Sequence, residues 1–167
     1  MNPALELKQL LLAEPRQTLA AAESVTAGHL QARIASVSGA SGYFLGGITA
    51  YTLAQKVRHL GVNEAHAASV NCVSPQVAAE MARGVAELFG TNIGVATTGY
   101  AEPSAEEKVE SPMACWAIAH LPPSGEIVLR SGRLEFPGAA RIEAQARLTE
   151  TVIVELVSYL KRWRQDG

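Results

Sequence analysis

A serine and a threonine follow a short apolar stretch near the start of the chain, and both are suited to chemistry. Ser24 and Thr26 come directly after Glu23 and just before an expected helix. Open α/β sheets place ligands where strands end, and a helix N-terminus offers free N–H groups and a partial positive charge. The pattern predicts a site for a phosphate or a developing oxyanion. The competing interpretation is that Ser24 or Thr26 only caps the helix.

Two further segments of this kind follow later apolar stretches. Lys56 lies on an expected short helix just past the second strand. A lysine there acts as a base if burial strips its water, although most lysines are simply on the surface. Thr98 and Gly99 open an irregular loop at the end of a third strand. That arrangement is typical of ligand binding, and it is also an ordinary strand exit.

Several other kinds of site have no support in the sequence. The histidines, His29, His59, His66 and His120, lie in four different expected elements, without HxxxH or HExxH spacing. We therefore expect no metal site. The absence of a Walker loop and of GxGxxG gives no support to nucleoside triphosphate hydrolysis or to Rossmann dinucleotide binding, so we expect no cofactor. A serine–histidine pair stays open, because nothing in the sequence joins Ser24 to a particular histidine.

Together these segments resemble the C-terminal domain of the CinA (competence/damage-inducible) family, and the resemblance covers nearly the whole chain. The matching segments are 22–28 (AESVTAG, for AESCTGG), 39–47 (for PGSSxYFxGG), 50–62 (for AYSNxAKxxxLGV), 73–74 (for the start of a VSxxVAxxMA helix), 98–103 (TGYAEP, for TGIAGP) and 136–138 (FPG, for FxG). Several ordered motifs at near-family spacing make the match specific.

The resemblance implies an activity, because active members of that family are nicotinamide mononucleotide deamidases. It implies that Ser24 attacks the carboxamide carbon while neutral Lys56 accepts the serine proton, without a metal. Backbone N–H groups at the start of the following helix would stabilise the oxyanion. Substrate contacts are implied for Glu23, Thr26, Tyr51, Thr98, Gly99 and Arg141.

The chain departs from the family pattern around the expected substrate, at Val25, Ala27, Glu102, Ala114 and Ala140. Glu102 replaces a glycine, and its bulk and charge would repel a mononucleotide phosphate unless the loop turns away. Arg141 is out of step by one with a family arginine, which removes a natural phosphate partner. Two hypotheses follow: an amidohydrolase acting on nicotinamide mononucleotide or a related pyridine nucleotide, and an inactive paralogue serving as a small-ligand-binding or assembly domain.

Helices and strands that must position these residues alternate along the chain. Helical spacing of apolar residues predicts helices over 4–13, 26–37, 53–60, 64–70, 75–89 and 140–163. Apolar runs predict strands over 18–22, 43–51, 92–97, 113–120, 126–130 and 133–136, with a polar loop over 99–112 and a turn over 122–125. The order predicts a three-layer α/β/α sandwich with a mixed, mostly parallel sheet and an antiparallel portion near its end. On the 75–89 helix, the expected buried stripe is Val77, Met81, Val85 and Leu88.

Composition limits the class of protein. The 167 residues, 48% hydrophobic and 18% charged, suit a single globular domain over 1–167. Two cysteines exclude a disulfide scaffold and suit a reducing cytosol, so we expect a cytoplasmic protein. The net charge is −2, and the only basic block is Lys161, Arg162 and Arg164, so we expect no nucleic-acid partner. The chain has no run of about 18 apolar residues and no signal-peptide pattern, so we expect no membrane partner.

The closing helix, 140–163, has apolar residues on more than one stripe from Val152 onward. A helix that faces one core needs only one such stripe. The breadth, together with the self-association of the family that the chain resembles, predicts a homo-oligomer. The competing interpretation is a helix buried on two sides within its own domain.

Overall fold

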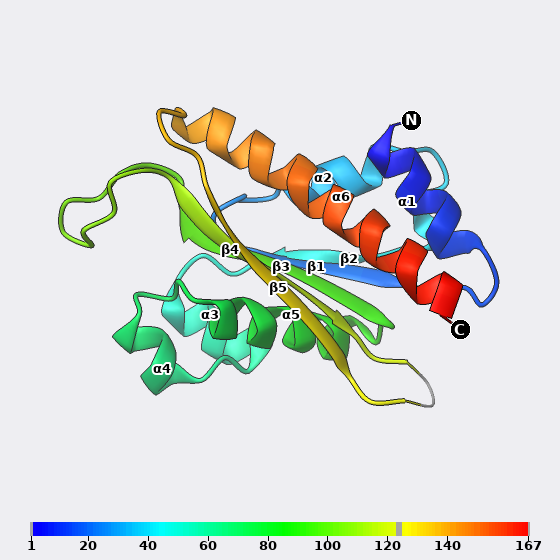
Figure 1. Cartoon of the computed structure of the whole chain (residues 1–167). Helices are drawn as coiled ribbons and strands as arrows, with labels where there is room; N and C mark the ends of the chain where they lie inside the picture. Colours follow the sequence, from blue (N-terminus) through cyan, green and yellow to red (C-terminus); the bar gives the residue numbers. More distant parts are fainter. Residues whose placement is uncertain (1, 123–124, 167) are drawn as a thin grey trace.

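Five strands form one mixed sheet between two layers of helices in the computed structural model, which describes residues 2–122 and 125–166 (Figure 1). The strands are β1 (Leu19–Glu23), β2 (Phe44–Thr49), β3 (Ile93–Tyr100), β4 (Met113–His120) and β5 (Val128–Glu135). The helices are α1 (Pro3–Leu12), α2 (His29–Ala35), α3 (Leu53–Leu60), α4 (Glu64–Ser69), α5 (Pro75–Phe89) and α6 (Arg141–Asp166), with a 3₁₀ turn η1 (Ala40–Gly42).

The sheet combines a parallel part with an antiparallel part, as predicted. Its strand order is β2-β1-β3-β4-β5. Strand β1 pairs in parallel with β2 and β3, while β4 pairs in antiparallel with β3 and β5. All of β1 is buried, which suits a central parallel strand covered on both faces. The α/β class and the mixed sheet expected from the sequence are therefore confirmed.

Strand β5 corrects the prediction of separate strands over 126–130 and 133–136. One continuous strand runs through Gly132, which pairs with Trp116 on β4. A Cβ at Gly132 would lie 2.6 Å from the Trp116 indole nitrogen. The glycine thus makes room for the indole and does not interrupt the strand. Residues 123–124, at the centre of the expected 122–125 turn, lie outside the described residues.

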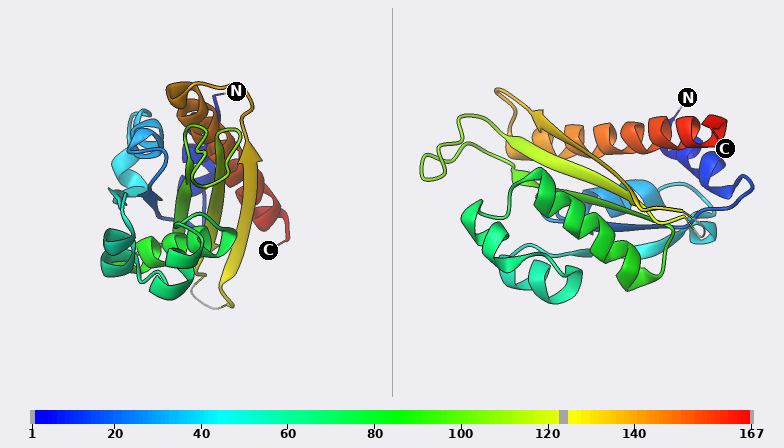
Figure 2. Two further views of the ribbon diagram at one scale, coloured as in Figure 1. Left: turned by 90° about the vertical axis from the view of Figure 1, so that its left-hand side faces the viewer. Right: turned by 60° about the horizontal axis from the view of Figure 1, so that its bottom comes forward.

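Each face of the sheet has its own hydrophobic core. Helices α1, α2 and α6 cover one face, and α3, α4 and α5 cover the other (Figure 2). Side chains along β1 alternate between the cores, with Leu19 and Ala21 facing one and Ala20 and Ala22 the other. Helix α5 approaches the sheet so closely that a Cβ at Gly94 would lie 1.9 Å from a carbonyl oxygen of the helix.

Helix α5 also corrects one residue of its expected buried stripe. Val77, Met81 and Val85 are fully buried, whereas Leu88 is 51% exposed. Gly84 abuts the last residue of α3, so Leu88, one turn further along, lies beyond the end of the helix that covers this flank.

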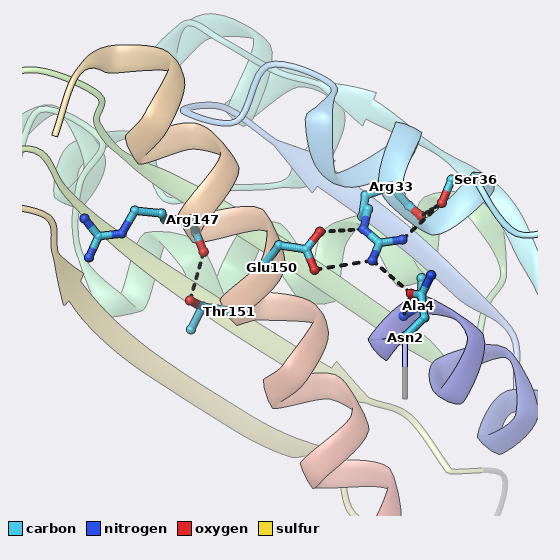
Figure 3. A network of polar contacts seen from close by, with 7 residues as sticks. All are labelled: Asn2, Ala4, Arg33, Ser36, Arg147, Glu150 and Thr151. Atoms are coloured by element: carbon cyan, nitrogen blue, oxygen red, sulfur yellow. Dashed lines mark hydrogen bonds and ion pairs between the residues drawn. The ribbon is translucent and has the colours of Figure 1, made fainter.

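Helix α6 packs against the sheet and also beside α1 and α2, so its broad apolar surface is largely buried within the chain. The Arg33 guanidinium of α2 binds the Glu150 carboxylate of α6 and donates to Asn2 Oδ1, the N-cap of α1, at 2.9 Å (Figure 3). Intrachain packing therefore accounts for the breadth without a second copy, and self-association stays a prediction. None of the described helices combines the length and apolarity needed to cross a membrane.

Candidate active site

The Glu23 carboxylate organises the turn that carries Ser24. Glu23 ends β1, is fully buried, and accepts hydrogen bonds from the backbone N–H groups of Gly28 (2.9 Å), Leu30 (3.0 Å) and Gln31 (2.7 Å). An acidic group at a helix N-terminus satisfies unpaired donors and complements the helix dipole. Glu23 therefore caps α2, a function that the sequence pattern had indicated for Ser24 or Thr26.

Thr26 lies beneath the turn and is also fully buried. Its hydroxyl donates to Glu23 Oε2 at 2.5 Å, so Thr97 Oγ1, 2.7 Å away on β3, is the donor to Thr26. From α6, the Gln145 amide donates to the Val25 carbonyl at 2.9 Å. Glu23 and Thr26 support the turn from within the core, and neither is among the residues that line the cavity beside Ser24. This differs from the substrate contacts expected for them.

Lys56 lies directly opposite Ser24. It projects from α3 and is only 1% exposed, while Ser24 is 7% exposed. The Lys56 Nζ is 2.8 Å from Ser24 Oγ, 2.9 Å from the Ala50 carbonyl oxygen and 3.0 Å from the Tyr51 carbonyl oxygen. The pair expected from the sequence is thus in direct contact, although the two residues are 32 positions apart.

Burial shifts the pKa of this lysine in favour of the neutral amine. Removal of water lowers the pKa of Lys56 below its usual value, and the nearby Cys72 thiol opposes the shift. Within the described residues, no carboxylate forms an ion pair with Lys56 to offset the cost of burying its charge. Either protonation state satisfies the three contacts. The ammonium donates to all three oxygens, whereas the neutral amine donates to the two carbonyls and accepts a hydrogen bond from the Ser24 hydroxyl.

A cavity of about 430 Å³ opens above this pair. It takes in most of the expected site residues, namely Ser24, Tyr51, Lys56, Thr98, Gly99 and Arg141. The Thr98 hydroxyl already donates to the Cys72 carbonyl at 2.7 Å, so it offers a substrate mainly its acceptor capacity. In the described part of the chain, no three His, Cys, Asp or Glu side chains gather as metal ligands would.

One wall of the cavity, formed by the segment between α4 and α5, contains none of the site residues predicted from the sequence. Asn71 and Cys72 line the cavity there, and both have left-handed backbones, with φ of 46° and 63°. Asparagine tolerates this region, whereas cysteine seldom adopts it. Tyr100 contributes a ring from β3 and accepts a hydrogen bond from the Asn71 amide at 3.2 Å. Only the asparagine gave any sequence signal for this turn.

An ion pair crosses the exposed rim of the cavity. Arg141, the first residue of α6, donates through Nη2 to Glu102 Oε1 at 2.6 Å and through Nε to Glu102 Oε2 at 3.4 Å. The guanidinium lowers the pKa of the Glu102 carboxyl. The hydrogen bonds to Glu102 raise the pKa of Arg141 in turn. The loop carrying Glu102 therefore turns toward the cavity.

Comparison with known proteins gives the family. The model of the CinA C-terminal domain matches residues 3–160. The chain belongs to the CinA C-terminal domain family. A CinA-like protein of Chlorobium phaeobacteroides is 37% identical over 148 residues, which cover 87% of this chain and 34% of the relative. A putative competence-damage inducible protein of Moorella thermoacetica is 48% identical over 100 residues, covering 59% of this chain and 24% of the relative. This CinA domain thus spans about a third or less of these curated relatives.

Solved structures show the same fold. The competence damage-inducible protein A of Klebsiella pneumoniae superimposes with a TM-score of 0.87 at 23% identity, covering 96% of both chains. A CinA superfamily protein of Escherichia coli gives 0.84 at 25% identity, covering 93% of this chain and 87% of that one. The CinA fold therefore accounts for nearly all of this chain.

Proposed function

We propose that this CinA domain is an amidohydrolase that cleaves the carboxamide of a pyridine nucleotide or a closely related amide. The observation that carries the proposal is the contact between Ser24 Oγ and the buried Lys56 Nζ, 2.8 Å apart at the base of a cavity. A nucleophile within hydrogen-bond reach of a base that is held by further contacts is the arrangement that covalent catalysis requires. The pyridine amide as substrate class comes from the family resemblance.

The first half of the reaction uses Lys56 as base and then as acid. Ser24 Oγ forms a bond to the carboxamide carbon while its proton moves to the Lys56 lone pair. The carbonyl oxygen becomes an oxyanion. Within the described residues, the backbone N–H groups of Val25 and Thr26 have no protein acceptor, and they are the donors nearest in sequence to the nucleophile. The oxyanion collapses, Lys56 returns the proton to the leaving nitrogen, and ammonia departs.

The second half releases the acid. Water attacks the ester on Ser24 and gives a proton to Lys56. The second tetrahedral intermediate then collapses: the bond from the acyl carbon to Ser24 Oγ breaks, Lys56 returns the proton to Ser24 Oγ, and a free carboxylic acid leaves. The net change is amide plus water to acid plus ammonia. Tyr51 and Tyr100 line the same cavity. The face of a tyrosine ring attracts a positive charge, so these two side chains suit a pyridinium ring.

A second candidate is a ligand-binding or assembly domain without turnover. The observation favouring it is the rim, where Glu102 already occupies the Arg141 fork that would hold an anionic substrate. On this hypothesis the cavity retains its shape and binds a ligand, while the chemistry of the pair is unused.

Ammonia release separates the two candidates. We expect release from nicotinamide mononucleotide or nicotinamide riboside, measured by a coupled glutamate dehydrogenase assay, and loss of release in Ser24→Ala. Ser38→Ala, a change at an exposed serine, is the matched control and should behave like the parent. No release from either amide, together with saturable binding by calorimetry, would favour the binding domain.

The remaining expectations concern the setting of this activity. A small-molecule substrate is the partner that the proposal requires, and we propose a cytoplasmic homo-oligomer. Light scattering should then give a mass above the 17.6 kDa of one chain at micromolar concentration. A monomer mass would contradict self-association and leave the amidohydrolase proposal unaffected.

A further inference from the structure

The charged groups around the cavity suggest which amides fit. Among the described residues that line it, the cations are Lys56 and Arg141 and the acid is Glu102. Lys56 is held by Ser24 and by backbone carbonyl oxygens at the base of the cavity. As the neutral base of the proposed reaction, it contributes no positive charge.

The remaining cation is already engaged by a carboxylate. Both Glu102 oxygens face the Nε–Nη2 edge of Arg141, which is the edge that would receive two oxygens of a phosphate. The Arg141 side chain is 44% exposed and the Glu102 side chain is 60% exposed, so an anion arriving from solvent competes directly with Glu102 for Arg141. Displacing Glu102 leaves its negative charge on the same rim, where it repels the incoming anion.

The helix expected to receive an anion does not present its N-terminus to the cavity. The N–H groups of Gly28, Leu30 and Gln31 all donate to Glu23 inside the core. A carboxylate therefore already occupies the N-terminus of α2. These bonds are independent of the Glu102–Arg141 pair, and both sets of contacts disfavour a phosphate.

We infer that the cavity selects amides that carry no phosphate or other anionic group, and that Glu102 sets this preference by holding Arg141. The inference rests on the proposed function and narrows its substrate class to pyridine ribosides or smaller amides. Nicotinamide riboside keeps the pyridinium charge, which Glu102 attracts, and lacks the phosphate, which Glu102 repels.

Calorimetry on the Ser24→Ala protein tests the preference without turnover. We expect nicotinamide riboside to bind about tenfold more tightly than nicotinamide mononucleotide at low salt, and Glu102→Gln in the same background to narrow the ratio to about threefold or less. Glu106→Gln is the matched control, because Glu106 is an exposed carboxylate of the same loop that does not line the cavity. Equal affinities in the parent, or a ratio unmoved by Glu102→Gln, would overturn the inference.

Inorganic phosphate tests the charge argument without any amide. In ¹H–¹⁵N spectra, we expect phosphate to leave the Arg141 Nε–H signal of the parent unmoved and to shift it saturably in Glu102→Gln. Saturable shifts in the parent would overturn the inference, whether at Arg141 or at the backbone N–H of Leu53, which begins α3 beside the cavity. So would the absence of a shift in the variant. Failure to release ammonia from any amide would instead reject the proposed function. The phosphate titration would still decide whether Glu102 keeps anions from Arg141.

Discussion

The base and the rim of the cavity are built in different ways. At the base, Ser24 and Lys56 are 7% and 1% exposed, and the lysine amine has three oxygen neighbours. At the rim, the side chains of Glu102 and Arg141 are 60% and 44% exposed and form an ion pair that solvent reaches. A buried polar group needs every partner, whereas an exposed one can change with little cost to the fold.

This difference separates two aspects of function. In the proposed reaction, the base determines which bond is broken, because the proposed nucleophile Ser24 and the proposed general base Lys56 are held there by the core. The proposed role of the rim is to select the ligand, because its charges lie at the entrance of the cavity. A substitution at the rim should therefore alter ligand preference without altering the contacts at the base.

Removal of the base amine gives the largest expected effect. Lys56→Met keeps the length and apolar stem but loses the proton acceptor, so ammonia release should fall by about a thousandfold or more. Lys8→Met, at a half-buried lysine of α1 that does not line the cavity, is the control and should retain parental turnover. Circular dichroism checks that both variants fold. Near-parental turnover of Lys56→Met would remove the lysine from the mechanism.

The parent's pH profile adds a direction to that test. The reaction needs neutral Lys56, so kcat/KM should rise with pH and reach its plateau below the 10.5 typical of a free lysine, because burial lowers this pKa. A profile that still rises at pH 10.5 would show a lysine that water reaches.

A buried histidine outside the cavity tests whether burial alone makes a polar group sensitive. His120 is fully buried, with Tyr159 Oη 2.7 Å from Nδ1 and Gln17 Oε1 3.1 Å from Nε2. Burial lowers the pKa of His120 from 6.5 to about 4. Between those values the unfolded chain binds the proton and the folded chain does not, so stability falls as pH falls. The loss should approach about 3 kcal/mol near pH 4.

Urea unfolding at pH 7 and pH 4.5 measures that loss. His120→Gln should remove most of the pH dependence, whereas His59→Gln, at a half-buried histidine of α3 beside Gln55, should retain it. If His120→Gln keeps the parental pH dependence, other groups cause it.

An exposed residue within the Ser24 turn should give a smaller effect. Ala27 has a left-handed backbone with φ of 48°, which is unfavourable for a residue with a Cβ, and stands where the family resemblance expects glycine. Ala27→Gly should stabilise the domain by up to about 1 kcal/mol in chemical unfolding, since the relief of strain exceeds the added entropy of the unfolded chain. Ala32→Gly, within α2, should destabilise it by about as much. Destabilisation by Ala27→Gly would show that the left-handed turn costs nothing.

The rim substitution should have the smallest effect on stability. Glu102→Gln removes half of an exposed ion pair, so the melting temperature should stay at the parental value within measurement error. Differential scanning calorimetry checks this. A clear drop would mean that the rim supports the fold, and the distinction between base and rim would fail.

Local sequence patterns predicted the bounds of helices and strands better than the contacts between them. The spacing from Leu53 to Leu60 and the apolar run from Met113 to His120 gave the observed bounds of α3 and β4. The prediction that Leu88 is buried was wrong, because its exposure depends on where helix α3 ends. No local pattern reports such a distance.

The same limit applies to the candidate site. Motifs placed Ser24 and Lys56 in one site, and the structure brings them into contact. They did not show that Glu23 points inward to cap α2, because a carboxylate at a strand end has the same sequence signature in either orientation. The pairing of Glu102 with Arg141 joins residues 39 positions apart and depends on how the 101–112 loop folds back.

The contacts of α6 have a consequence for synthesis on the ribosome. Arg141 reaches the rim and Gln145, one turn later, holds the Val25 carbonyl beside the nucleophile. Ser24, Lys56 and the whole sheet precede these residues in the chain, so they leave the exit tunnel first. A nascent chain therefore carries Ser24 and Lys56 before the Gln145 contact to the turn and the Arg141 contact at the rim can form. Ser24, the proposed nucleophile, gains the complete surroundings seen in the folded domain only when α6 emerges and docks.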